Sequence, residues 1–406
     1  MVNQITRSAS FLITTLLLLV SAIANAQTFV PGSTYYDETG YVEYRAGNLP
    51  IIISAPHGGD LEPDSIPDRT CENCNTIKDT YTQEISEGMY QAINSETGCY
   101  PHLIINLLHR VKFDANRDID DAADGNTHVE QAWNAYHQFI DSAKHSVTQE
   151  YGRGLFLDMH AHGHEIQRIE LGYLLSSSDL RLDDVTLNKA EFIAESAINT
   201  LAKDNISKLT HAQLLRGAQS FGSLLHDKGF PSVPSTTDPF PQVEDKYFDG
   251  GYNTERHSSF ENNGPIDGIQ VELNKDIRFD DAVRKMLIDS MSKTTLEYYD
   301  LHYNSSFLGN YCGLLIDLSA NDNSIRQVNI FPNPAQDYFG IDESLQADQV
   351  EIYNHLGQLL LMEKYSGQAI KIDELKTGNY IVLLKREGEI VGTAKLIKST
   401  TGVNQE

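Results

Sequence analysis

Three continuous apolar runs constrain the fold of this chain more than any other feature, and they lie at residues 51–53, 103–105 and 155–157. Strands that are buried on both faces carry such runs, because helices cover each face of a parallel sheet. Segments with the apolar periodicity of amphipathic helices lie between and after these runs, at residues 81–94, 129–147, 187–202 and 282–299. This alternation predicts an α/β domain in which helices flank a mixed, largely parallel sheet.

The character of the sequence changes at a polar stretch over residues 319–326, which is typical of a linker. Beyond it, five short strand-like runs alternate with turns rich in glycine, proline and asparagine, and this pattern predicts a small all-β sandwich. We therefore expect a signal peptide at residues 1–26, a main domain at residues 27–322 and a second domain at residues 323–406. Residues 27–45 are expected to be a polar lead-in with one short strand.

The first 26 residues have the features of an export signal. Arg7 supplies a positive charge, residues 11–20 form an apolar core, and Ala24 and Ala26 form an A-x-A cleavage signal. The apolar core is shorter than the roughly 20 residues that span a bilayer. We therefore expect export through the periplasm and no transmembrane helix in the mature chain.

Charge and cysteine content narrow the partners and the compartment. The formal net charge of −26 argues against a nucleic-acid partner, because phosphate binding requires clustered Lys and Arg. Disulfides persist in the oxidising environment outside the cytoplasm. We expect loop disulfides rather than a zinc ribbon, because only one C-x-x-C pair is present among Cys71, Cys74, Cys99 and Cys312.

Two of the buried runs end in histidines. His57 follows the first run and precedes two glycines, which would allow a ligand to approach the backbone closely. His160, His162 and His164 follow the third run, and their alternation places them on one side of an extended backbone. Strand ends face the crevice where α/β proteins bind ligands, and neutral imidazole is the commonest metal ligand. The sequence therefore predicts a zinc site, with Asp158 orienting a histidine ligand from behind.

Two further features suggest substrate binding and proton transfer. Arg110 and Arg117 lie in one charged segment, and arginine grips a planar carboxylate through two parallel hydrogen bonds. Glu272 lies within an apolar strand pattern, and burial of a glutamate raises its pKa so that it can act as a general base.

These residues together resemble the N-formylglutamate amidohydrolase family, which is related to the zinc carboxypeptidases. The motifs that carry the resemblance lie at residues 55–59, 79–82, 110 with 114–117, 158–160 and 270–272. The resemblance implies that residues 27–322 form a catalytic domain and that this domain binds a Zn²⁺ ion. His57, an acidic residue and His160 would hold it.

The resemblance leaves some assignments open. Asp79 is preferred as the acidic ligand over Asp60, which would form a compact His-x-x-Asp with His57, and His162 could replace or assist His160. Glu272 corresponds to the general base of the family. Arg117 corresponds to the anchor of a substrate carboxylate, with help from Arg110. His257 is a further candidate for contact with the substrate.

The implied reaction is cleavage of an amide bond in an N-acyl amino acid or peptide that bears a carboxylate. Outside the cell, peptides, acylated amino acids and cell-wall fragments are more suitable substrates than formylated metabolites. Two alternatives stay open. One is a metal-dependent ester or phosphoester hydrolase, whose second metal would recruit Asp60, His162 and His164. The other is a non-catalytic secreted module that binds zinc or a carboxylate.

The tail resembles the C-terminal sorting domain of the type IX secretion system. The matching motifs lie at residues 329–334, 350–354 with Gly357, 375 with 378–380, and 395–397. The resemblance implies that the type IX machinery is a partner, and that the protein is secreted or reaches the cell surface.

Overall fold

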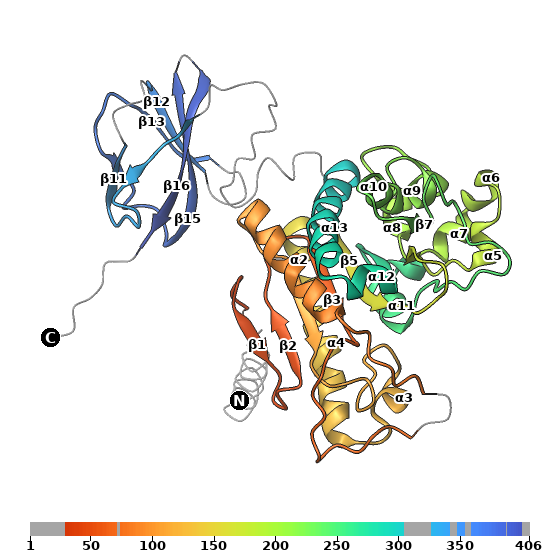
Figure 1. Cartoon of the computed structure of the whole chain (residues 1–406). Helices are drawn as coiled ribbons and strands as arrows, with labels where there is room; N and C mark the ends of the chain where they lie inside the picture. The colour runs from red at the N-terminus through yellow and green to blue at the C-terminus, as the bar shows by residue number, and fades with distance from the viewer. Residues whose placement is uncertain are drawn as a thin grey trace, which may run out of the picture.

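The computed structural model describes residues 29–70, 74–303, 326–341, 347–353, 359–386 and 388–399 (Figure 1). An N-terminal unit runs to residue 303, a C-terminal unit begins at residue 326, and each is described by itself. The predicted signal peptide and the predicted boundary between residues 322 and 323 lie outside the described residues.

An eight-stranded sheet forms the centre of the N-terminal unit, in the order β1-β2-β4-β3-β5-β8-β6-β7. The central strands β4, β3, β5 and β8 run parallel. Antiparallel pairs join β1 to β2, β2 to β4 and β6 to β8. The sheet is therefore mixed and largely parallel, as predicted. Its strands are Thr34–Tyr36 (β1), Val42–Arg45 (β2), Ile51–Ala55 (β3), His102–Asn106 (β4), Gly154–Ala161 (β5), Ile169–Gly172 (β6), Ser232–Val233 (β7) and Ile266–Leu273 (β8).

Helices cover both faces of this sheet, and the pleat of β3 shows how. Ile51 and Ile53 belong to a core cluster with helices α2 and α13, whereas Ile52 belongs to a second cluster with helix α4. Helices α2 and α13 lie side by side, and their layer and α4 enclose the sheet (Figure 1). Three of the four predicted helices are confirmed, with the bounds Thr82–Thr97 (α2), Thr127–Tyr151 (α4) and Asp281–His302 (α13).

The prediction of one helix at residues 187–202 is wrong, because α6 ends at Leu187 and the chain then forms two short helices, α7 and α8. The carbonyl oxygen of Leu187 lies 2.8 Å from His211 Nδ1, and the side chain of Asn188 accepts a hydrogen bond from the Ala212 amide. These contacts with the start of α9 interrupt the helix that local periodicity favours. The short helices of this region are α5 (Ser177–Leu180), α6 (Asp184–Leu187), α7 (Ala190–Ala194), α8 (Asn199–Lys203), α9 (His211–Arg216) and α10 (Phe221–Asp227). The other short elements are α3 (Ile119–Ala123), α11 (Tyr252–His257), η1 (Phe260–Asn262) and α12 (Lys275–Phe279).

The expected polar lead-in is also wrong in part, because strands β1 and β2 join the main sheet. Val42 and Tyr44 are buried in the α4 core cluster. Glu43 lies between these two residues and forms a 2.5 Å ion pair with Arg45. These two charges account for the polar character of the sequence at β2. A four-residue strand is too short to show a clear alternation.

The C-terminal unit contains two small sheets that share one core. The strand orders are β10-β11-β14 and β13-β12-β15-β16-β9. Phe339 of the first sheet and Val350 of the second belong to the same cluster of buried side chains, so the predicted sandwich is confirmed. The strands are Arg326–Gln327 (β9), Ile330–Phe331 (β10), Tyr338–Ile341 (β11), Gln349–Tyr353 (β12), Leu359–Lys364 (β13), Ile370–Lys371 (β14), Gly378–Arg386 (β15) and Glu389–Lys398 (β16).

Two observations bear on the compartment. Cys74 and Cys99 are both disulfide-bonded, as predicted, and Cys71 and Cys312 lie outside the described residues. Among the described residues, every helix is too short or too polar to cross a membrane.

Candidate metal centre

The carboxyl ends of three parallel strands bring the predicted residues together. His57 follows β3 after one residue, His160 is the last residue but one of β5, and Glu272 is the last residue but one of β8. The register pairs Ser54 with Asp158 and His160 with Glu272. Because these strands are neighbours in the sheet, their ends place both histidines and the glutamate at one edge.

Asp79 reaches this edge through the turn before α2. Its amide donates a 3.0 Å hydrogen bond to the carbonyl of His57, and its own carbonyl accepts hydrogen bonds from the amide and hydroxyl of Thr82. The turn requires a left-handed backbone at Tyr81 (φ 73°), which is uncommon outside glycine. The guanidinium of Arg284 lies 4.2 Å from the centre of the Tyr81 ring and helps to hold it there.

His57, Asp79 and His160 form a compact, buried set of potential ligands. Asp79 Oδ2 lies 3.2 Å from His57 Nδ1 and 3.4 Å from His160 Nδ1. One ligand atom from each residue lies within 4.8 Å of the other two. Two imidazole nitrogens and a carboxylate oxygen are a donor set that zinc takes readily.

The far nitrogen of each imidazole is held by a second carboxylate. His57 Nε2 lies 2.6 Å from Asp114 Oδ1, and His160 Nε2 lies 2.7 Å from Asp158 Oδ2. Such partners fix the tautomer and the ring orientation of a metal-binding histidine. Both histidines therefore present Nδ1 to the same oxygen of Asp79.

The electrostatics of the centre favour a cation. Burial works to lower the pKa of His160, but Asp158 and Asp79 outweigh it and raise this pKa to about 10. Burial works to raise the pKa of Asp79, but hydrogen bonds from His160 and His57 hold it below its ordinary value. The carboxylates that stabilise a proton on His160 would equally stabilise a metal ion there. The donor set and its charge thus fit a divalent metal.

Glu272 lies beside this centre and is buried. Its Oε1 accepts a 2.9 Å hydrogen bond from Gln270, and its Oε2 is buried without a hydrogen-bond partner among the described residues. Burial raises the pKa of Glu272 to about 8, with His160 opposing the shift and Asp79 adding to it. A carboxylate with a raised pKa and a free oxygen is suited to accept a proton near neutral pH.

The two predicted arginines lie in different surroundings. Arg110 is buried, and its guanidinium contacts Asp79 at 3.5 Å and Asp114 at 3.1 Å. Arg117 is exposed, and its Nη1 donates to the carbonyl of Asn116. The side chain of Asn116 in turn lies 3.5 Å from His160 Nε2. Arg110 is therefore part of the buried charge network, whereas Arg117 lies at its rim.

The remaining candidates lie apart from the three-residue set. Asp60 is exposed and pairs with Lys78 at 2.6 Å, so the structure brings Asp79, and not Asp60, to the histidines. His257 is fully buried on the α4 side of the sheet. Its Nε2 lies 2.8 Å from His137 Nδ1.

The two glycines after His57 serve the packing of the protein itself. A Cβ atom at Gly58 would lie 2.6 Å from the Gln83 amide nitrogen, and one at Gly59 would lie 2.3 Å from the carbonyl of Leu107. The close approach that the sequence suggested for a ligand is therefore made by neighbouring backbone.

His162 and His164 form a second group with Glu170, which the sequence did not predict as a site residue. The sequence also did not predict Asp114 as the partner of His57, although Asp114 lies in one of the motifs that carry the family resemblance. The D-x-H spacing on one strand revealed Asp158, whereas Asp114 is 57 residues from His57 in the sequence. Only the fold brings that pair together.

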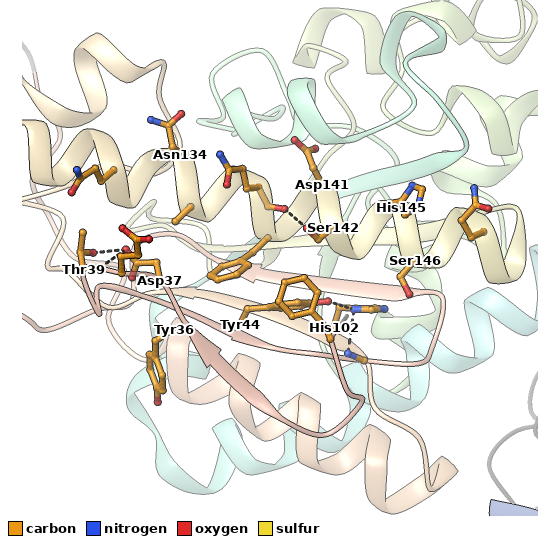
Figure 2. A pocket seen from close by; sticks show the side chains of 18 of the residues that line it. Tyr36, Asp37, Thr39, Tyr44, His102, Asn134, Asp141, Ser142, His145 and Ser146 are labelled. Carbon is orange, nitrogen blue, oxygen red and sulfur yellow. Dashed lines mark hydrogen bonds between the residues drawn. The ribbon is translucent and has the colours of Figure 1, made fainter. Parts of the chain in front are cut away.

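A cavity of about 1320 Å³ lies elsewhere, between strands β1 and β2 and helix α4 (Figure 2). Its one buried histidine is His102, whose Nδ1 lies 2.8 Å from the Tyr44 hydroxyl and 3.2 Å from the Gly47 amide. Burial lowers the pKa of His102 to about 3, so this ring is a neutral core residue. The cavity contains none of the ligands described above, and we place the candidate site at the strand ends.

Comparisons with known proteins concern both units. Residues 329–399 match the family model of the secretion system C-terminal sorting domain, and this part of the chain is such a domain. It marks the protein for export to the cell surface or the extracellular space, as predicted. The chain is also 33% identical over 84 residues to ulvan lyase NLR42 of Nonlabens ulvanivorans, a match that covers 20% of this chain and only 16% of that relative.

Solved structures similar to this chain have low sequence identity. The N-formylglutamate amidohydrolase of Ralstonia eutropha is 14% identical, with 67% of this chain and 98% of that chain covered at a TM-score of 0.38. A putative carboxypeptidase A of Shewanella denitrificans is 12% identical, with 68% of each chain covered at a TM-score of 0.30. The succinylglutamate desuccinylase of Chromobacterium violaceum is 13% identical, with 71% of this chain and 73% of that chain covered at a TM-score of 0.29.

Proposed function

We propose that this protein is an exported zinc-dependent hydrolase that cleaves an amide bond in an N-acyl amino acid or a peptide bearing a carboxylate. One observation carries the proposal. His57 and His160 direct Nδ1 at the same oxygen of Asp79, and a buried carboxylate holds the far nitrogen of each ring. A histidine that only stabilises a core does not require this convergence.

His57, Asp79 and His160 would hold the zinc ion. When bound with an open position, zinc lowers the pKa of a water molecule and polarises a carbonyl group. Glu272 would take the proton from the attacking water and later deliver it to the leaving amine. Its buried, unpartnered Oε2 is the atom suited to this transfer.

Arg117 is proposed to bind the carboxylate of the substrate. Its exposed guanidinium keeps donors available beyond its bond to the Asn116 carbonyl. Arg110 is engaged by Asp79 and Asp114, so we assign it a supporting role through its charge. An anchored carboxylate would fix the orientation of the amide at the centre.

The sorting domain bears on the substrate class. A protein that is exported meets peptides, acylated amino acids and cell-wall fragments rather than cytosolic metabolites. We therefore propose substrates of this kind, with a free carboxylate near the scissile amide.

The test combines metal content with turnover. Plasma mass spectrometry of the purified protein should detect zinc, and His160→Ala should lose the ion of this centre, whereas the exposed-histidine control His145→Ala should keep it. A panel of N-acyl amino acids and peptides, each with a free and an amidated carboxyl terminus, should show turnover that requires the free carboxylate. Equal zinc content in the wild type and His160→Ala would contradict the proposed centre. Metal binding without turnover of any amide would favour a binding module.

A further inference from the structure

A second group of potential ligands lies on the other side of Glu272 from His160. The register pairs Glu272 with His160 of β5 and with Glu170 of β6, so the three residues form a row across three strands. Glu170 Oε1 lies 2.8 Å from His164 Nδ1 and 4.0 Å from His162 Nδ1. One ligand atom from each member of this second group lies within 4.8 Å of the other two.

The surroundings of His162 prepare it as a ligand. Its Nε2 lies 2.8 Å from the carbonyl oxygen of Arg168, and a carbonyl can only accept a hydrogen bond. The proton of the neutral ring is therefore on Nε2, and Nδ1 carries the electron pair that a ligand or a donor can use. The amide of His164 donates to that nitrogen over 3.1 Å, so Nδ1 is an acceptor, and a bound ion would take the place of this hydrogen bond. A backbone carbonyl behind a histidine ligand is a common arrangement at metal sites.

Glu170 is a buried carboxyl group that lies near two histidine rings. The side chain is fully buried, and its Oε2 accepts a 2.9 Å hydrogen bond from the Phe248 amide. The nearby Arg168 does not pair with it, because its guanidinium bonds to Asp238 and Asp245. Glu272 adds a second buried carboxyl group at the paired position. Buried carboxylates are normally paired with a cation or coordinate a metal.

We infer that His162, His164 and Glu170 form a second cation site. Two imidazole nitrogens and one carboxylate oxygen suit Zn²⁺ or another late first-row divalent ion. The site shares no ligand with His57, Asp79 and His160, so each site is expected to bind its ion independently of the other.

The second ion would stabilise the position of the β5–β6 connection against the sheet. His162 and His164 belong to that connection, whereas Glu170 is in β6. The ring of Phe248 stacks on His164 at 4.7 Å, and the Phe248 amide bonds to Glu170, so the segment before α11 would be held as well. This role differs from hydrolysis, which is assigned to the first centre.

The experiment counts metal ions in protein without a polyhistidine tag. The full exported protein is stripped with a chelator, titrated with Zn²⁺ and then with Co²⁺ in a calorimeter, and analysed by plasma mass spectrometry. We expect two ions per chain in the wild type and in the control His145→Ala, and one ion in His164→Ala. His160→Ala should also bind one ion, which separates failure of the first centre from failure of the second.

A wild type that binds one ion, with the same count in His164→Ala, would overturn the second site. Because His164→Ala removes a partly buried ring, Glu170→Gln serves as a second variant that keeps the size of the side chain. It should also bind one ion and keep the circular dichroism spectrum of the wild type. Two ions in Glu170→Gln would contradict the inference as well.

Discussion

His160 of β5 and Glu272 of β8 occupy paired positions of two parallel, hydrogen-bonded strands. Side chains at paired positions point to the same face of the sheet, about 5 Å apart at their origins. The proposed zinc ligand and the proposed base are therefore positioned by the sheet, and their separation does not depend on a loop. Sites built on strands hold their geometry better than sites built on loops.

Replacement of Glu272 by glutamine is the first test of this arrangement. Glu272→Gln keeps the size of the side chain but cannot accept a proton, so turnover should fall by about 10²–10⁴-fold. Zinc content should stay that of the wild type, because Glu272 is not among the proposed ligands. Steady-state kinetics and plasma mass spectrometry measure the two quantities. Glu165→Gln, on the exposed surface nearby, is the matched control. Full activity in Glu272→Gln would remove Glu272 from the mechanism.

Asp158 should affect metal affinity without being a ligand. Its Oδ2 lies 2.7 Å from His160 Nε2, while Ser54 donates to its Oδ1. Asp158→Asn weakens the hold on the imidazole, and loss of such a partner typically lowers metal affinity by about 10–100-fold. Competition with a chromogenic chelator measures the affinity. The exposed Asp204→Asn should change nothing, and an unchanged affinity in Asp158→Asn would show that the imidazole needs no support.

The strand ends of the site could be predicted from the sequence. A buried parallel strand is a continuous apolar run, and the polar residues that follow it lie at the crevice. Glu272 and the D-x-H pair followed from the same local signal. Asp79 required the family resemblance to prefer it over Asp60, since the structure brings it to His57 across a 22-residue separation. Asp114 contacts His57, and Glu170 contacts His164, only because the fold brings these residues together. The interrupted helix after Leu187 shows the same limit, because contacts with α9 outweigh local periodicity there.

The stability of the metal-free protein should fall as the pH rises above about 7. The pKa of His160 is raised from 6.5 to about 10, and that of Glu272 from 4.5 to about 8. A group with a raised pKa stabilises the folded chain below its ordinary pKa, and this contribution is lost as the pH rises through the raised value. Both groups therefore lower the stability as the pH rises from about 7 towards 10. Buried histidines with a lowered pKa, such as His102, are neutral in both the folded and the unfolded chain over this range.

Bound zinc would replace the proton on His160, so the metal-loaded protein should lose less stability over this range. The difference in Tm between loaded and metal-free protein should consequently widen from about pH 6 to about pH 9. Differential scanning calorimetry with and without a chelator measures it. A difference that narrows with pH would contradict the assignment of His160 as a ligand that exchanges a proton for the metal.

Gly59 should tolerate no side chain. A Cβ atom there would lie 2.3 Å from the backbone of Leu107, which cannot move without shifting the end of β4. Gly59→Ala should lower the free energy of unfolding by about 1–3 kcal/mol, the usual cost of overpacking. Gly163→Ala is the matched control, because no atom of the described part of the chain lies within 4 Å of a Cβ atom at that position. Urea denaturation measures both, and equal stability of the two variants would be the contrary result.

Arg278 ties together the three segments that carry the site. Its Nε donates to the carbonyl of Leu273, its Nη1 to that of Thr80 and its Nη2 to that of His162. These carbonyls lie one or two residues after Glu272, Asp79 and His160 in the chain. The planar guanidinium has three nitrogens that donate in different directions, one to each of these carbonyls. The single ammonium group of a lysine cannot make all three contacts.

Arg278→Lys should therefore keep the charge but loosen the alignment of base and metal centre. We expect kcat to fall by about 10²-fold with little change in KM, because small displacements of catalytic groups have effects of this size. Zinc content should be retained, which distinguishes misalignment from loss of the centre. Arg153→Lys, whose ion pair with Asp204 lies at the surface, should behave like the wild type. Unchanged kcat in Arg278→Lys would show that the three segments hold their positions through the sheet and the helices alone.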